Sequence, residues 1–262
     1  MGKLLQADLY RIFKSKLFLA LALIAFLFPV FTVLLYLLIF KVFATVDIPG
    51  IAAVTMSGRE MISECFVLHS NFGFILPIFT TIFICMDISN GTMRNKIIAG
   101  RSRASIYFSH LISASIINVS GILIYVIIFM AFSSLFFPYG VTLDGEEIIK
   151  IIYFMITGIF TFIFSASLSA AFTLSLKSTA PSIILSILTG MGISMLVNLL
   201  HMTDPFTTNV WMCLIPTYTN SSFLSTGQFD TTNFLLGILS YVVFIVLINA
   251  AGLLIYSKKD IK

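Results

Sequence analysis

The amino-acid sequence predicts an all-α membrane protein with six transmembrane helices, preceded by an N-terminal interfacial helix. Hydrophobic residues make up 59% of the 262-residue chain and charged residues only 10%, whereas soluble domains average about 45–50% and about 25%. The apolar residues are collected in six long stretches, and most of the basic residues lie in alternate connectors. These observations place residues 1–262 in a bilayer as one polytopic domain.

Each apolar stretch is long enough to cross a membrane as a helix, since about 20 helical residues span a hydrocarbon core of about 30 Å. The predicted spans are residues 17–40, 66–86, 104–137, 148–176, 181–200 and 234–256. No Asp, Glu, Lys or Arg lies in the middle of a span. Such residues mark proton- and sodium-coupled carriers, so the sequence argues against that class of transporter.

The charged residues predict the orientation of the spans. Twelve of the fifteen Lys and Arg residues lie before the first span, after the second, after the fourth and after the sixth. The other connectors carry eight of the eleven acidic residues. Short basic loops stay in the cytoplasm, so both termini are expected there. The pI of 9.0 therefore indicates contact with anionic lipid and gives no support for nucleic-acid binding.

Residues 1–16 are expected to form an amphipathic helix in the cytoplasmic interface. Apolar and polar side chains are interspersed at helical spacing. They are Leu4, Leu5, Leu9, Ile12 and Phe13, with Gln6, Asp8, Arg11, Lys14 and Lys16. The alternative is that these residues are only the charged flank of the first span and have no interfacial role. No cleavable signal peptide is evident, because the first apolar run is too long and lacks a small-residue cleavage site.

The connector at residues 201–233 is too apolar for an ordinary loop exposed to water. It includes Trp211 and Tyr218, and Pro216 would divide it into two short helices. Apolar pieces of about 10–14 residues more often dip into the interface or pack on a bundle. A re-entrant outer segment is therefore predicted, with an irregular loop as the alternative.

Small and hydroxyl-bearing residues recur every four positions in the fourth and fifth spans. They are Thr157, Thr161, Ser165, Ser169 and Thr173, followed by Ser182, Ser186, Gly190, Ser194 and Asn198. Such stripes let helices approach closely and exchange modest hydrogen bonds in lipid. Helix packing is the simpler interpretation, and a wall of a substrate path or a subunit interface is the functional alternative.

The connectors carry little chemistry of their own. None is long enough for an independent domain, which usually needs more than about 40 residues, and a phosphate-binding loop is absent. His69, His110 and His201 are expected to be interfacial or hydrogen-bonded. Glu146 and Glu147 resemble the paired glutamates of CAAX-type intramembrane proteases but stand at a water-facing edge. We expect neither an enzyme nor a metal site, and no cofactor bound directly by this chain.

The connector between the second and third spans, residues 87–103, has the most specific pattern. An acid at the membrane edge is followed by Gly-Thr, a basic stretch and Gly-x-x-Arg before the next span. The residues concerned are Asp87, Gly91, Thr92, Arg94, Lys96, Gly100, Arg101 and Arg103. They predict a short helix along the membrane.

On this predicted helix, Ile97 and Ile98 are expected to face the membrane. Arg94, Lys96 and Arg101 are expected to face water or a partner. Within the chain, Asp87 is the expected carboxylate partner of Arg94 or Arg103.

This segment resembles the coupling region of type II ATP-binding-cassette exporter permeases. The closest likeness is to the short permeases of bacitracin-type export and lantibiotic immunity, and it extends over the six spans and the amphipathic start. The family often has Glu at the position of Asp87 and Pro at that of Gly100. The resemblance implies two permeases, identical or homologous, paired around a path above two cytoplasmic ABC ATPase subunits. Residues 91–103 would then couple the ATPases to the spans.

The same resemblance implies export of an amphipathic or lipid-like substrate, such as an antimicrobial peptide or antibiotic, from a bacterial plasma membrane. ATP and Mg would be bound by the partner ATPase. The alternative from another functional class is a non-transporting six-span scaffold or sensor subunit, which would need no ATPase contact.

Overall fold

The structure, a computed structural model, describes residues 2–45, 58, 65, 71–138, 140, 144–203 and 231–258. Within these ranges the regular elements are all helical, and six of the helices are long and apolar enough to cross a membrane. The prediction of an all-α chain with six spanning helices is thereby confirmed. The elements are α1 (Gly2–Lys14), α2 (Lys16–Thr45), the 3-10 helix η1 (Asn71–Phe74), α4 (Ile75–Ser89), α5 (Thr92–Ile98), α6 (Arg103–Phe136), α7 (Gly145–Leu176), α8 (Thr179–Thr203) and α10 (Thr231–Lys258).

The helices extend past several predicted span ends. α4 continues to Ser89, past the predicted end of its span at residue 86, because Asp87 is buried and ion-paired and so does not end the helix. α2 likewise runs to Thr45. Residues 66–70 of the second predicted span, and residues 204–230 of the predicted re-entrant segment, lie outside the described residues.

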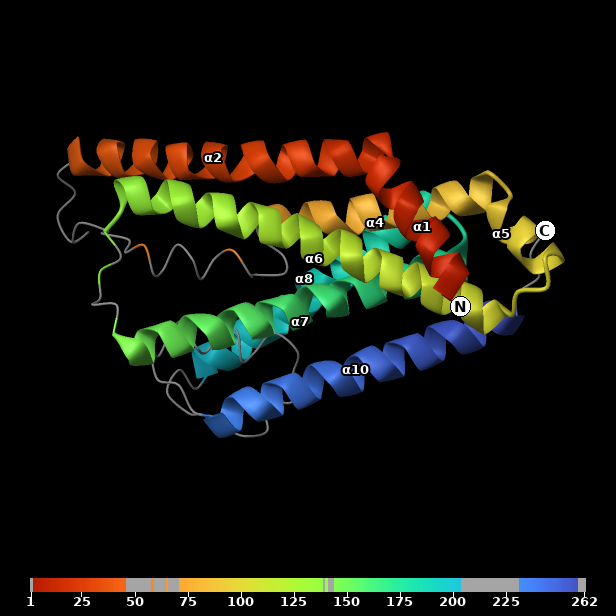
Figure 1. Ribbon diagram of the computed structural model, residues 1–262. Helices are drawn as coiled ribbons and strands as arrows, with labels where there is room; N and C mark the ends of the chain where they lie inside the picture. The colour runs from red at the N-terminus through yellow and green to blue at the C-terminus, as the bar shows by residue number, and fades with distance from the viewer. Residues whose placement is uncertain are drawn as a thin grey trace.

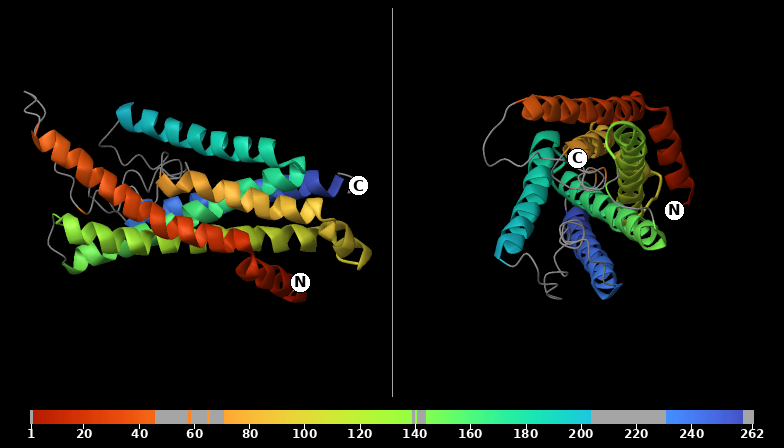
Figure 2. Two further views of the ribbon diagram at one scale, coloured as in Figure 1. Left: turned by 90° about the horizontal axis from the view of Figure 1, so that it is seen from above. Right: turned by 90° about the vertical axis from the view of Figure 1, so that its left-hand side faces the viewer.

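Three helices, α4, α6 and α7, contact one another and form the centre of the bundle. Each of the other three long helices packs against two of these central helices (Figures 1 and 2). α2 lies on α4 and α6, α8 on α4 and α7, and α10 on α6 and α7. The central helix α4 is more enclosed than the covering helices. Of its membrane-spanning part 56% is buried, compared with only 22% of the spanning parts of α8 and α10.

The outward faces of the covering helices are apolar. Leu23 on α2, Leu188 on α8 and Leu247 on α10 are 53%, 57% and 59% exposed. In a membrane these side chains contact lipid tails, in which an exposed leucine carries no penalty. The described helices therefore fit a multi-pass membrane protein.

Polar side chains link the central helices to one another. Thr80 on α4 donates a 2.7 Å hydrogen bond to Asn118 on α6, and the amide of Asn118 donates to the carbonyl oxygen of Phe162 on α7. Thr161 on α7 and Tyr241 on α10 share a 2.6 Å hydrogen bond between their hydroxyls. Such bonds average about 0.6 kcal/mol in lipid, so they specify helix contacts more than they stabilise them.

Gly252 of α10 is buried where this helix crosses α6 and α7. A β-carbon built there would collide with the hydroxyl of Tyr107 and lie 3.0 Å from the β-carbon of Ala171 and 3.3 Å from its α-carbon. The α-carbon belongs to the backbone of α7, which cannot move aside as a flexible side chain can. Close approach of α10 therefore requires glycine at this position.

We expect Gly252→Ala to destabilise the bundle by about 1–3 kcal/mol, the range for overpacking a well-packed core. The control is Gly192→Ala on α8, where an added β-carbon meets no described atom within 4 Å. Thermal unfolding in detergent, followed by circular dichroism, measures both. Equal melting temperatures for the two variants would contradict the close contact of α10 with α7.

Candidate functional site

A turn built around Gly91 places α5 directly after α4. Gly91 has a φ of 67°, in the left-handed region that glycine adopts without a steric penalty. The hydroxyl of Thr92 donates a 2.8 Å hydrogen bond to the carbonyl oxygen of Asp87. These contacts fix the direction of α5 relative to α4.

A second left-handed glycine, Gly100 with a φ of 77°, ends α5. Its amide donates to the carbonyl oxygen of Ile97. Ser102 then caps α6, because its hydroxyl oxygen accepts a 3.2 Å hydrogen bond from the amide of Ser105. The Gly-Thr and Gly-x-x-Arg patterns thus correspond to the two ends of a short helix.

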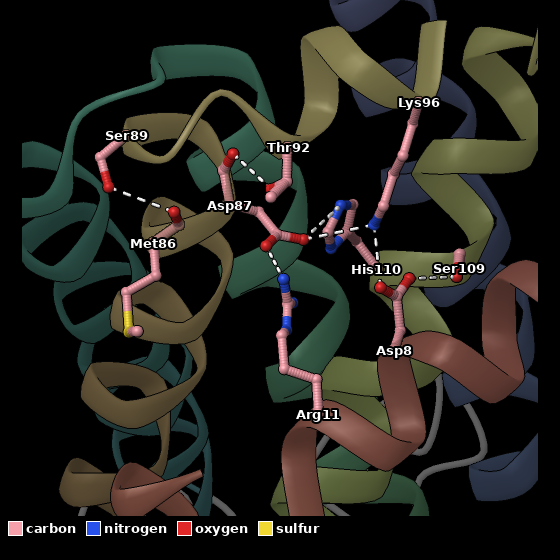
Figure 3. A network of polar contacts seen from close by, with 9 residues as sticks. All are labelled: Asp8, Arg11, Met86, Asp87, Ser89, Thr92, Lys96, Ser109 and His110. Carbon is pink, nitrogen blue, oxygen red and sulfur yellow. Dashed lines mark hydrogen bonds and ion pairs between the residues drawn. The ribbon is translucent and has the colours of Figure 1, made fainter. Parts of the chain in front are cut away.

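Charged and polar side chains from four helices meet at this end of the bundle (Figure 3). We call them the charge cluster: Asp8 and Arg11 of α1, Asp87 of α4, Lys96 of α5, and Ser109 and His110 of α6. Asp87 and His110 are fully buried, and Asp8 is 3% exposed. Ionisable residues at the edge of a membrane bundle are costly to bury and are often functional.

Lys96 lies between the two carboxylates of the cluster. Its ammonium donates a 2.8 Å hydrogen bond to Oδ1 of Asp8 and a 3.3 Å hydrogen bond to Oδ2 of Asp87. A second short bond to Asp8, 2.6 Å, comes from the hydroxyl of Ser109. Through one lysine, α5 is therefore linked to both α1 and α4.

Arg11 supplies the second cation of the cluster. Its Nη1 pairs with Oδ1 of Asp87, and its guanidinium lies 4.6 Å from the centre of the Phe83 ring, a cation–π contact. Nε2 of His110 lies 3.5 Å from Oδ2 of Asp87. Two carboxylates thus face two cations, which offsets much of the cost of burying each charge.

The surroundings of the two α1 residues lower the pKa values of both, Asp8 through its partners and Arg11 through burial. Burial by itself raises the pKa of Asp8, but hydrogen bonds from Lys96 and Ser109 and the charge of Lys96 outweigh it and hold the pKa below its ordinary value. Burial lowers the pKa of Arg11, and the charge of Asp8 opposes this. Asp8 is therefore ionised at neutral pH, and arginine stays protonated in proteins.

One of our predictions for α5 is wrong. Lys96, expected to face water or a partner, points inward, and only 15% of its side chain is exposed. Ile98 is 74% exposed, and its contact with the membrane stays a prediction. The buried apolar residue of α5 is Met93. Met93 and Lys96 are three positions apart and share one helix face, and the two carboxylates attract the lysine to that face. Arg94 is exposed, as predicted.

The prediction that Asp87 pairs with Arg94 or Arg103 is corrected as well. In the described part of the chain the cationic partners of Asp87 are Arg11 and Lys96. Arg103 instead donates a 2.7 Å hydrogen bond to the carbonyl oxygen of Ser257, in the last turn of α10. Unpaired carbonyls at the end of a helix attract cations, which favours this contact.

The remaining residues of the predicted coupling segment lie where a partner can reach them. Arg101 is exposed, and Gly91 and Gly100 stand at the two ends of α5. Sequence reasoning missed the site roles of Asp8, Arg11, Ser109 and His110. One signal for Asp8 is present: it stands four residues from both Leu4 and Ile12, so the buried face of α1 contains a single acid.

The small-residue stripes of α7 and α8 pack inside the chain. Thr161, Ser165 and Ser169 are buried, as are Ser182, Ser186, Gly190 and Ser194, while the side chain of Asn198 lies outside the described set. Ser165, Ser186 and Gly190 line a small crevice between α7, α8 and the start of α4. The positions of these residues agree with the helix-packing interpretation.

Metal ligands do not gather anywhere in the described residues, where no group of three or more His, Cys, Asp or Glu could hold an ion. The contacts within the charge cluster are ion pairs and hydrogen bonds between side chains. Its geometry suits holding α1, α4, α5 and α6 together.

A family model with the description Protein of unknown function (DUF2705) matches residues 42–262. The chain belongs to this family. No curated protein and no solved structure matches the chain. The DUF2705 match includes Asp87, Lys96 and His110 but begins after α1, which supplies Asp8 and Arg11. The charge cluster thus joins the matched region to the helix that precedes it.

We expect Lys96→Met to destabilise the protein by about 3 kcal/mol. The substitution leaves two buried carboxylates without their shared ammonium, and breaking a buried pair from one side costs about 3–5 kcal/mol. Arg94→Ala is the control, since Arg94 is an exposed cation on the same helix and surface changes stay within about 0.5 kcal/mol. Thermal unfolding in detergent compares them, and a similar loss in both variants would rule out a special role for Lys96.

Proposed function

We propose that this chain is the transmembrane permease subunit of an ATP-driven ABC exporter. The observation that carries the proposal is the two-sided character of α5. Its outer side exposes Arg94, and its inner side is held by Lys96 to the carboxylates of α1 and α4. Arg101, in the turn that follows α5, is exposed as well. A short helix between two spans with these properties is suited to receive a displacement and transmit it.

The proposed partner of α5 is a cytoplasmic ABC ATPase that binds ATP and Mg. Contact with Arg94 would move α5, and Lys96 would carry that movement to Asp8 and Asp87. Because α4 lies at the centre of the bundle and contacts α6, α7 and α8, a shift of α4 reaches most of the other spans. A second permease, identical or homologous, would complete the path.

The proposed orientation puts both termini and α5 in the cytoplasm of a bacterial cell. The start of α1, the end of α10 and α5 lie at the same end of the bundle (Figure 1). Basic residues concentrate at this end, which is the pattern of cytoplasmic loops. α1 is proposed as an amphipathic interfacial helix, since it exposes Tyr10 and Phe13 beside Lys14, and aromatic and basic residues suit the headgroup region.

An amphipathic or lipid-like substrate, such as an antimicrobial peptide or antibiotic, suits this architecture best. Outward faces rich in leucine and phenylalanine can receive a substrate that is already dissolved in the membrane. The competing function, a non-transporting scaffold or sensor subunit, needs the six spans but does not need an exposed arginine on the helix between two of them.

Cysteine labelling tests the orientation. Single cysteines at Asp144 and Asp230 should react with an impermeant reagent in intact cells. Cysteines at Asn95 and Lys258 should react only after permeabilisation, because basic loops remain inside. The reverse pattern would refute the cytoplasmic placement of α5, and with it the proposed ATPase contact.

The coupling role is tested by Arg94→Ala in the complex with its ATPase. We expect a folded, inserted protein whose ATPase partner no longer responds to substrate, because truncating one partner of a desolvated interface charge pair costs about 2–5 kcal/mol. Substrate-stimulated ATP hydrolysis in reconstituted vesicles is the measurement. Lys258→Ala, an exposed cation in the last turn of α10, is the matched control.

Normal stimulation in Arg94→Ala would remove α5 from the mechanism. If no ATPase co-purifies with the wild-type chain, the scaffold or sensor function replaces the exporter proposal.

A further inference from the structure

The buried imidazole of His110 takes no part in the hydrogen bonds that hold the charge cluster together. Its ring is fully buried, and neither Nδ1 nor Nε2 has a hydrogen-bond partner among the described residues. Nε2 lies 3.5 Å from Oδ2 of Asp87 without completing a hydrogen bond. A buried polar group without a partner is unfavourable, so packing alone does not account for a histidine at this position.

His110 and Lys96 approach the same oxygen of Asp87 from two different helices (Figure 3). The ammonium of Lys96 donates its 3.3 Å hydrogen bond to Oδ2, the atom that Nε2 of His110 faces. A proton on the imidazole would therefore place a second positive charge beside the ammonium. Like charges in a buried site repel strongly, so a proton on His110 and the ammonium of Lys96 compete for Asp87.

The charges of the cluster balance while His110 is neutral. Two negative charges come from Asp8 and Asp87, and two positive charges come from Arg11 and Lys96. A proton on His110 would leave one buried positive charge uncompensated, which is costly. If Lys96 is withdrawn, one negative charge is left over instead, and a proton on His110 cancels it.

The charged side chains that surround His110 belong to α1, α4 and α5, and they are Asp8, Arg11, Asp87 and Lys96. On α6 itself, Tyr107 stands one turn before His110 and packs against Tyr256 of α10. Residues 157–176 of α7 contain no ionisable side chain. Within this set, Lys96 is carried by the short helix α5, so a movement of α5 changes the charge that His110 meets.

We propose that His110 is a proton-binding site that substitutes for Lys96. When α5 moves and withdraws the ammonium, the ring nitrogen without a hydrogen takes a proton from water, and the imidazolium formed pairs with Asp87. Two ligands that exclude each other weaken each other's binding by the same factor. Acid pH therefore favours the displaced position of α5, and neutral pH favours the position in which Lys96 is seated. Histidine suits this role because its charge changes between about pH 5 and about pH 8.

The site uses only residues of this chain and so does not depend on the exporter proposal. In a permease whose ATPase displaces α5, it adds regulation by cytoplasmic pH, because each displacement takes up one proton. Measurements on the chain without an ATPase test the site, so a negative result would leave the exporter proposal standing.

Nuclear magnetic resonance of the full chain in detergent micelles, with isotope-labelled histidine, reports the charge of His110 directly. The chain has three histidines, and the spectrum of His110→Gln identifies the signal of His110. In the wild-type protein we expect the ring to stay neutral from about pH 8 to about pH 5.5. In Lys96→Met, which removes the ammonium, we expect it to take up a proton within this range.

Two controls separate the loss of the ammonium from other changes. Arg94→Ala removes an exposed cation from the same helix and should leave His110 neutral. Lys96→Met/Asp87→Asn removes one charge of each sign, so the balance is kept and the ring should again stay neutral. A ring that stays neutral in Lys96→Met, or that takes up a proton equally in the wild type or in either control, would overturn the proposal.

The stability of Lys96→Met gives a second measurement, because this variant is expected to lose stability at neutral pH. Its melting temperature should rise from about pH 7.5 to about pH 5.5, since its folded state then binds a proton more tightly than the unfolded chain does. Adding His110→Gln should remove most of this rise, with His110→Gln alone as the control for folding. An equal rise in both backgrounds would assign the proton to a carboxylate and contradict the proposal. Failure of Lys96→Met to fold at either pH would also contradict it, because a protonated His110 should replace the missing charge.

Discussion

A carboxylate buried among apolar helices is unfavourable unless cations surround it, and this requirement determines how one end of the molecule is assembled. Asp87 is fully buried, so the chain must bring it positive partners. It does so with Arg11 from α1 and Lys96 from α5, elements on either side of α4 in the sequence. Asp8 uses the same lysine, which makes the arrangement of α1 and α5 interdependent.

Because α4 lies at the centre of the bundle, the need to neutralise Asp87 also affects the helices that pack against α4. Its middle lies against α6 and α7, and its last turn carries Asp87. The most enclosed spanning helix of the described chain is therefore also the one that ends in the charge cluster. Because protein interiors are packed as closely as organic crystals, a change in the direction of α4 at its charged end must be accommodated by the helices around it.

The sequence predicted the fold well and the site in part. Apolar stretches separated by charged connectors identify spanning helices, because length and hydropathy alone decide whether a helix can cross a bilayer. The ends of α5 were also predictable, since Gly91 and Gly100 mark turns. The partners of Asp87 were not, because the contacts with Arg11 and His110 depend on how distant helices pack. Likewise, its charge placed Lys96 on the side of water or a partner, whereas ion pairs with Asp8 and Asp87 turn this side chain inward.

The sequence separation within the charge cluster has a consequence for the order in which the molecule is built. The hydrogen bonds of Asp8 go to Lys96 and Ser109, which are 88 and 101 positions away. During synthesis, α1 must therefore wait until α4, α5 and the start of α6 have been made. Contacts between segments so far apart form only after the chain between them has been made and its loop closed. Although α1 is made before its partners, it can reach its final place only after them.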